Sequence, residues 1–184
     1  MPNKYDSKRE IKTFLYLYTA AEHALKLSKN LEEGLLYQFM TSLIFSAFTL
    51  EAALNDIGER VVPFWNELER ISPIQKFNVL HGYLKLPIDI SQRPAQTITL
   101  LFKFRNTMAH GKTERLSGIV ATENPDARPA ELPSLETFWE KFCTKKQAEE
   151  SLTDIKKIIK SICSAANLPE YFMETFGSES FHSI

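Results

Sequence analysis

Three residues near the middle of the chain carry side chains suited to chemistry at a phosphate ester: Arg105, Asn106 and His110. A guanidinium stabilises negative charge that develops on phosphoryl oxygens, and an imidazole donates or accepts a proton near neutral pH. Asn106 and His110 are four residues apart, so they occupy neighbouring positions on one face of a helix. Gly111 follows directly and is expected to end that helix in the left-handed C′ conformation. His110 would then lie beside free backbone carbonyls, which favours its charged form.

The residues around this motif predict a helix from Pro94 to about Ala109. On a helical projection the apolar side chains form one stripe, and Arg105 falls near its centre. The members of the stripe are Ile98, Leu101, Phe102, Met108 and Ala109. A guanidinium that faces a core is costly unless it is paired or lines a polar pocket. Arg105 is therefore either a structural ion-pair partner or part of a site.

A second helix, expected from about Leu31 to Val61, carries a carboxylate in a comparable position. Its apolar stripe comprises Leu43, Ala47, Leu50, Leu54, Ile57 and Val61, widened by Ile44 and Phe48. Glu51 and Asn55 project into this widened sector. We therefore predict that Glu51 contacts Arg105, and that Asn55 or Asn106 satisfies the remaining hydrogen bonds. Such a pair either aims Arg105 at a scissile phosphate or is purely structural.

These features together resemble the HEPN superfamily (higher eukaryotes and prokaryotes nucleotide-binding domains), which carries an Arg-polar-…-His motif. Here the motif is RNTMAH, residues 105–110. The segment FTLEAALN, residues 48–55, is similar to the second long helix of the family. The segment SPIQKF, residues 72–77, is similar to the start of its short middle helix. The resemblance covers roughly residues 10–166, most of the chain.

The resemblance implies metal-independent cleavage of RNA without a cofactor. In that scheme the 2′-hydroxyl attacks the adjacent phosphate and leaves a 2′,3′-cyclic phosphate. His110 would act as general acid or base, Arg105 would stabilise the developing charge, and Asn106 would orient His110 or the ribose. The resemblance further implies a toxin or antiphage-defence ribonuclease that works as a homodimer, with two motifs facing one cleft, and that has an antitoxin or regulatory protein as partner.

The sequence departs from some members of that superfamily. Members paired with a nucleotidyltransferase antitoxin often carry a Tyr-x-Tyr pattern shortly after the His, whereas GKTER follows His110 here. Regulation by nucleotide addition at such tyrosines is therefore not expected. Two other functions stay open. One is a non-catalytic HEPN-like module that binds a nucleotide, RNA or protein, and the other is a helical scaffold in which Glu51 and Arg105 form only a structural pair.

Positive charge is concentrated in the stretch of chain that contains the motif. The segment from Arg60 to Arg115 holds nine basic and four acidic residues, a net charge of +5, whereas the whole chain carries −1. Such a local excess attracts phosphates. Lys103, Lys112 and Arg115 are the candidate contacts to phosphate or RNA. The alternative interpretation is that these side chains lie on ordinary solvated helix faces.

Composition is that of a single domain, residues 1–184, with a helical core at 10–166 and a C-terminal tail at 167–184. Two cysteines without framework spacing indicate a reducing compartment, and with four scattered histidines they predict no metal site. The polar N-terminus does not resemble a signal peptide. The richest apolar run, 43–54, is interrupted by Ser46, Thr49 and Glu51, so no membrane span is expected. A cytoplasmic location follows.

The periodicity predicts an all-α fold: an antiparallel bundle of four to five main helices, with a long Pro-containing loop at 112–134 after the motif helix. Besides the two helices above, we expect helices at about 10–28, 72–84 and 144–166. Ser72 and Thr144 are the predicted N-caps of the last two. We also expect a short strand at 117–122 and a short docking helix in the tail.

Overall fold

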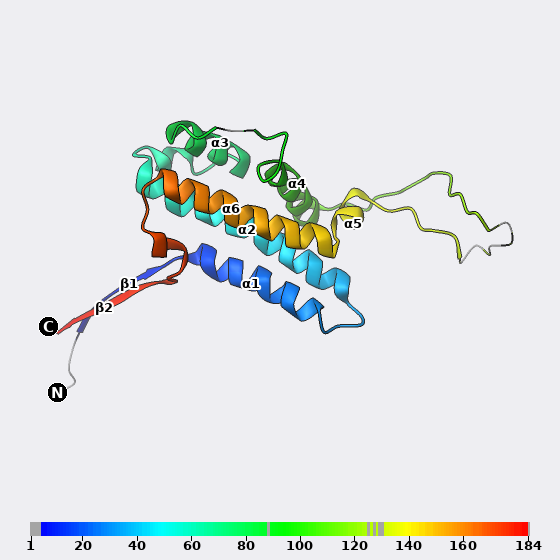
Figure 1. Ribbon diagram of the computed structural model, residues 1–184, viewed down its shortest axis with the longest axis horizontal. Coiled ribbons are helices and arrows are strands. Elements are labelled where there is room, and N and C mark those ends of the chain that lie inside the picture. Colours follow the sequence, from blue (N-terminus) through cyan, green and yellow to red (C-terminus); the bar gives the residue numbers. More distant parts are fainter. Residues whose placement is uncertain (1–4, 88, 125, 127, 129–130, 184) are drawn as a thin grey trace.

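The computed structural model describes residues 5–87, 89–124, 126, 128 and 131–183. As predicted, the chain is mainly helical, and it also has one small sheet (Figure 1). The helices are α1 (Thr13–Ser28), α2 (Leu35–Val61), α3 (Pro73–Tyr83), α4 (Gln96–His110), α5 (Phe138–Phe142) and α6 (Lys145–Ala165). Two 3₁₀ turns, η1 (Trp65–Leu68) and η3 (Glu170–Met173), and two strands, β1 (Tyr5–Ile11) and β2 (Gly177–Ser183), complete the elements used below.

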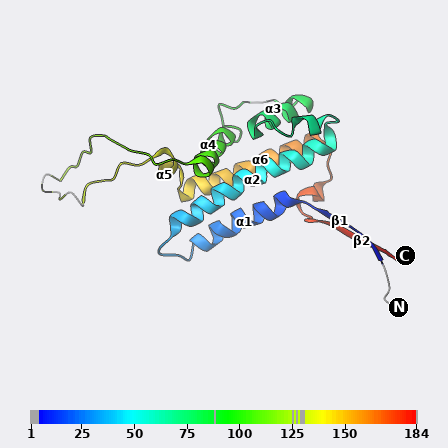
Figure 2. The same ribbon diagram turned by 180° about the vertical axis from the view of Figure 1, so that it is seen from behind.

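Helix α2 is the central element of the fold. It packs against α1, α6, α4 and α3, and the views from front and back agree on this arrangement (Figures 1 and 2). α1 runs in the opposite direction to α2, as two helices joined by a short turn must. α6 lies beside α2 and runs in the same direction (Figure 1). The shorter α4 crosses this layer and contacts both α2 and α6.

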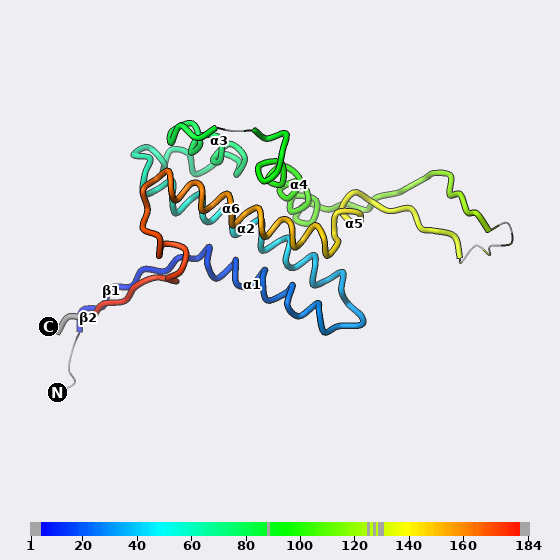
Figure 3. Tube along the Cα trace, in the orientation of Figure 1, coloured from blue at the N-terminus to red at the C-terminus, as the bar shows by residue number. Residues whose placement is uncertain are grey.

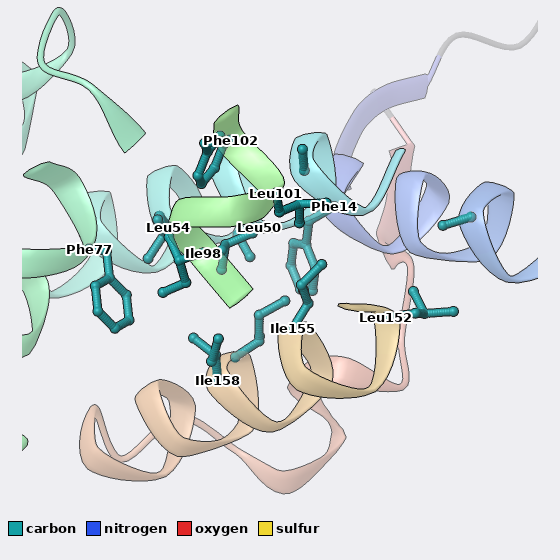
Figure 4. Packing of buried hydrophobic residues seen from close by; sticks show 14 of the residues in the cluster. Phe14, Leu50, Leu54, Phe77, Ile98, Leu101, Phe102, Leu152, Ile155 and Ile158 are labelled. Carbon is teal, nitrogen blue, oxygen red and sulfur yellow. The ribbon is translucent and has the colours of Figure 1, made fainter. Parts of the chain in front are cut away.

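The core lies where α1, α2, α4 and α6 meet (Figure 4). α2 supplies Leu50 and Leu54, and α4 supplies Ile98, Leu101 and Phe102. α1 contributes Phe14, and α6 contributes Leu152, Ile155 and Ile158. All of these side chains are buried, and each contributes roughly 1.5–3 kcal/mol to folding relative to an exposed one. The predicted stripe of α4 is thus largely correct, except that Ala109 is exposed and Phe104 takes a fully buried place.

α2 is the one helix among the described residues that is long and apolar enough to cross a membrane, judged by length and composition. Core helices of globular proteins share that character. Six apolar positions of α2 are wholly buried against its neighbours: Leu43, Ala47, Leu50, Ala53, Leu54 and Ile57. Packing within the fold therefore accounts for part of the apolar composition of this helix.

Side-chain caps fix several helix starts. The Ser72 hydroxyl accepts a hydrogen bond from the Gln75 backbone N–H, and the Gln75 side chain bonds back to the Ser72 N–H, with Pro73 as first helical residue. The Thr144 hydroxyl likewise accepts from the Gln147 N–H at 3.3 Å. Both predicted starts are confirmed. A second capping box, at Thr137, starts α5, which the periodicity did not predict because it spans only five residues.

The chain ends form a two-stranded antiparallel sheet, which the sequence did not predict. β1 pairs with β2 from Tyr5 opposite Ser183 to Ile11 opposite Gly177. The expected first helix therefore begins at Thr13 rather than residue 10. The tail, expected to be a docking helix, is the turn η3 followed by β2. Phe172 in η3 is buried and stacks on Phe14 at 5.8 Å between ring centroids, so the tail contributes to the core.

A long extended segment separates α4 from α5, as the prolines predicted. Its described residues between His110 and Thr137 form no α-helix and no strand, and the segment projects away from the helices (Figure 3). The short strand expected at 117–122 is absent, because this stretch finds no strand to pair with. The second helix begins at Leu35 rather than Leu31, and α4 at Gln96 rather than Pro94.

Candidate functional site

The start of α4 is fastened to α6 by a buried carboxylate. Asp154 accepts hydrogen bonds from Arg93 Nε at 2.6 Å and from the Thr97 hydroxyl at 2.5 Å. Glu150, one turn before Asp154, also pairs with Arg93. Burial of Ile98, Leu101 and Phe104 along α4 holds the rest of the helix on α2 and α6. These contacts therefore fix the position of α4, including the residues at its C-terminal end.

Arg105 lies on α4 where that helix faces α2. Its guanidinium forms an ion pair with Glu51, and the two side chains are 19% and 29% exposed. The predicted contact is thus present. The guanidinium carbon also lies 5.8 Å from the ring centre of Phe48 and 5.5 Å from that of Phe102, so Arg105 is held between two aromatic side chains. Both the charge pair and the rings limit the orientations that the guanidinium can adopt.

Asn106 supplies the remaining polar contact to Arg105. Arg105 Nη1 donates to Asn106 Oδ1 at 3.0 Å, on the solvent side of the pair. Of the two amides considered in the sequence, Asn106 is therefore the one that takes part. His110 is the last residue of α4, and its side chain is exposed. Among the described residues, one hydrogen-bonded network comprises Glu51, Arg105 and Asn106. His110 lies on the same helix, five residues after Arg105, and no described side-chain hydrogen bond joins it to this network.

Gly111 does not take the predicted left-handed conformation. Its φ and ψ are −53° and 136°, so the chain passes directly from α4 into the extended segment. Glycine is nevertheless suited to this place for a reason of space. A Cβ at residue 111 would lie 2.8 Å from the carbonyl oxygen of Thr107. The helix end beside His110 therefore depends on the small size of Gly111 rather than on its conformational freedom.

Asn55 is not part of the Arg105 network. Its Oδ1 accepts a hydrogen bond from Lys76 Nζ at 2.9 Å. Asn55 lies one turn beyond Glu51 on α2, where α3 rather than α4 is the neighbour, and this explains the different partner. Lys76 itself is buried, so two cationic side chains, Arg105 and Lys76, reach adjacent turns of α2 from two different helices.

The burial of Lys76 and its contact with Asn55 were not predicted from the sequence. Lys76 lies beside Phe77 and four residues before Leu80, and all three are buried on one face of α3. This helical spacing was readable from the sequence, just as it was for Glu51 and Arg105. The contact of Phe48 with Arg105 had no comparable signal, because it depends on the crossing of α4 over α2, whereas Phe102 precedes Arg105 by three residues on α4 itself.

The fold neutralises part of the positive charge that the sequence concentrates around the motif. Arg60 pairs with Glu10 and Asp56, and Arg93 pairs with Glu150 and Asp154. All four acids lie outside the basic stretch, residues 60–115. Part of the positive excess counted along the sequence is therefore balanced in space.

The three candidate phosphate contacts are exposed. Lys103 lies on α4 with its amino group 3.9 Å from the ring centre of Phe138. Lys112 and Arg115 follow His110 in the extended segment. They remain available to a ligand that approaches the end of α4, but no described contact joins them to Arg105.

No protein-family model matches the chain, and no curated protein or solved structure matches it significantly. Within the described ranges, no three or more His, Cys, Asp or Glu side chains are grouped so that they could hold a metal ion.

Proposed function

We propose that this protein is a HEPN-like endoribonuclease that cleaves RNA phosphodiesters without a metal ion. The observation that supports this proposal is the state of Arg105. Glu51, Asn106 and two aromatic rings hold its partly exposed guanidinium where α4 faces α2, and an exposed His110 ends the same helix. A guanidinium held in place and an imidazole further along the same helix are side chains of the kind that transfer at a phosphate ester uses. The main helices would form the bundle that the resemblance implies.

Arg105 retains hydrogen-bonding capacity for a substrate. A guanidinium carries five N–H donors. The contacts with Asn106 and Glu51 use one each on Nη1 and Nη2, and Nε is buried, so one N–H on each Nη remains for a substrate. The Asn106 contact lies on the solvent side, where a phosphoryl oxygen can approach. In the proposed reaction Arg105 stabilises the charge on that oxygen while the 2′-hydroxyl loses its proton and attacks the phosphorus; the bond from phosphorus to the 5′-oxygen breaks, and that oxygen leaves with a proton. The preorganised geometry means that little reorientation is needed when this charge develops.

His110 would transfer the proton to or from the reacting oxygens. One imidazole serves one of the two proton transfers at a time, so we further propose that two copies of the chain share one cleft, as the resemblance implies. The second His110 would then serve the other transfer. Lys103, Lys112 and Arg115 would contact flanking phosphates, in keeping with their exposure. The biological role proposed is that of a cytoplasmic toxin or antiphage-defence ribonuclease, controlled by an antitoxin or regulatory protein.

The test is incubation of the purified protein with end-labelled RNA, with and without EDTA. We expect cleavage in both, and products that end in a 2′,3′-cyclic phosphate. His110→Ala should abolish cleavage while the circular dichroism spectrum and the thermal midpoint stay unchanged, because the His110 side chain is exposed. His23→Ala is the matched control, since His23 is an exposed histidine on α1, and it should cleave like the wild type.

Each alternative gives a different result. RNA that is retained but left intact would indicate the non-catalytic binding module. Neither binding nor cleavage would favour the scaffold in which Glu51 and Arg105 are purely structural. Full activity of His110→Ala would remove His110 from the mechanism, and cleavage that EDTA stops would contradict a metal-independent reaction.

A further inference from the structure

A cavity of about 870 Å³ lies between α1 and α6, on a different part of the molecule from the motif. The segment that follows α6 closes one end of it. Neither Arg105 nor His110 is among its lining residues. A cavity of this volume is within the range of roughly 300–1,000 Å³ typical of sites for small organic ligands. It therefore requires an explanation separate from the ribonuclease proposal.

The lining of the cavity is part apolar and part polar. Phe14, Ile159 and the thiol of Cys163 lie at its base and are nearly covered, whereas Tyr18, Leu168 and Met173 are half-buried and form its apolar wall. The wall contributed by η3 is firmly attached, because Lys12 Nζ donates to the Phe172 carbonyl oxygen at 2.9 Å and to the Thr175 hydroxyl at 3.1 Å. The cavity is therefore bounded by packed core elements on each of these sides.

Charged side chains border the cavity in an ordered way. Lys156 and Lys160, one turn apart on α6, line the part nearer the middle of that helix. Glu170 and Glu174 line the opposite end, beyond the C-terminus of α6. Among the described residues, none of these four side chains takes part in an ion pair. One end of the cavity is thus basic and the other acidic.

Tyr18 adds an aromatic contact at the basic end. The Lys156 amino group lies 5.7 Å from the centre of the Tyr18 ring, and Tyr18 also lines the cavity. The tyrosine hydroxyl and two lysine amino groups are hydrogen-bond donors suited to a carboxylate. The acidic end would repel such a group, so the two ends together would set the direction in which an elongated anion lies.

We propose that this cavity binds an amphiphilic monoanion with a carboxylate head and an extended apolar body. The head contacts Lys156 and Lys160, and the body lies along the half-buried Tyr18, Leu168 and Met173. Charge complementarity at one end, this apolar wall and the volume of the cavity favour this class of ligand over a polar or a cationic one. This site is independent of the proposed ribonuclease site, and the two succeed or fail separately.

Calorimetric titration of the full chain with decanoate below its micellar range tests the proposal. We expect saturable binding at one molecule per chain, and at least tenfold weaker binding of decan-1-ol and decylammonium, because each lacks the negative head. The double variant Lys156→Glu/Lys160→Glu should likewise bind decanoate at least tenfold more weakly. Lys157→Glu is the matched control: it changes charge on the same helix at an exposed residue that does not line the cavity, and should bind like the wild type.

The alkylation rates of the two cysteines show whether decanoate occupies this cavity. Burial raises the pKa of both Cys143 and Cys163 to about 11, so both alkylate slowly, but only Cys163 lines the cavity. Decanoate should slow alkylation of Cys163 by iodoacetamide at alkaline pH and leave that of Cys143 unchanged, as read by mass spectrometry. The proposal is overturned by the absence of saturable decanoate binding, by equal affinity for decylammonium, by unchanged affinity of the double variant, or by an unaltered rate at Cys163.

Discussion

The indole ring of Trp65 lies directly on Gly58, where the last turns of α2 meet the turn η1. A Cβ at residue 58 would be only 2.2 Å from Trp65 Cε2, well inside contact distance. Both residues are buried, and Trp65 is part of the main core. The absence of a side chain at residue 58 is what allows the chain to turn back on α2 and cover its end.

Gly58→Ala is therefore expected to destabilise the protein, although alanine is the better helix former. The added methyl group must displace the indole ring, and overpacking of this kind costs about 1–3 kcal/mol in the free energy of unfolding. Urea denaturation measures the change. Gly82→Ala is the control, because nothing lies within 4 Å of a Cβ there, and it should raise stability by about 0.5–1 kcal/mol. Equal effects of the two substitutions would contradict this account of Gly58.

Breaking the pair of Glu51 and Arg105 is expected to lower stability. Arg105→Ala leaves Glu51 without its partner, and because both side chains are partly exposed we expect a loss of roughly 2 kcal/mol, below the ~3–5 kcal/mol of fully buried pairs. A double-mutant cycle with Glu51→Ala, followed by thermal unfolding, gives the coupling between them. The reference is Arg128→Ala, whose pair with Glu131 is largely exposed and whose loss should matter little. Purely additive effects at Glu51 and Arg105 would show that the pair contributes no stability.

His81 makes stability depend on pH. Burial lowers the pKa of His81 below its ordinary value of 6.5, and its ring packs on Phe77 with centroids 4.0 Å apart. Because the unfolded chain takes up this proton more readily, the contribution of His81 to stability is complete above pH 6.5. It is lost as the pH falls from 6.5 through the lower pKa of the folded state.

Urea unfolding at about pH 7.5 and pH 5.5 tests this prediction. His81→Phe retains an aromatic ring beside Phe77 but cannot be protonated, so it should lose less stability between the two pH values than the wild type does. His23→Gln, at an exposed position on α1, should follow the wild type. The same acid sensitivity in wild type and His81→Phe would mean that His81 is not the group responsible.

The sequence predicted those parts of the fold that depend on local patterns. The hydroxyls of Ser72 and Thr144 cap the helices that they were expected to start, because capping needs only residues three apart. The periodicity of α2 and α4 located Glu51 and Arg105 on facing surfaces, and the predicted ion pair is present. A charged residue within an apolar stripe is informative because burial requires that it have a partner.

Features that depend on distant segments were not predictable in this way. β1 and β2 pair across almost the whole chain, and β1 is exposed throughout, so its sequence lacks the alternation that identifies a half-buried strand. Asn55 was one of two amides predicted to contact Arg105, because the two helices were expected to face each other, whereas the position of α3 and its Lys76 was not predicted. The role of His110 stays a prediction, since an exposed side chain leaves no packing signature.

The pairing of β1 with β2 brings residue 5 opposite residue 183, so the path of the chain is nearly circular. A short peptide that joins residue 183 to residue 5 would span little distance, and new termini opened within residues 112–124 would interrupt no helix or strand. We expect such a circular permutant to fold and to unfold at a similar temperature. The order in which the helices are synthesised is, on this view, separable from the way in which they pack.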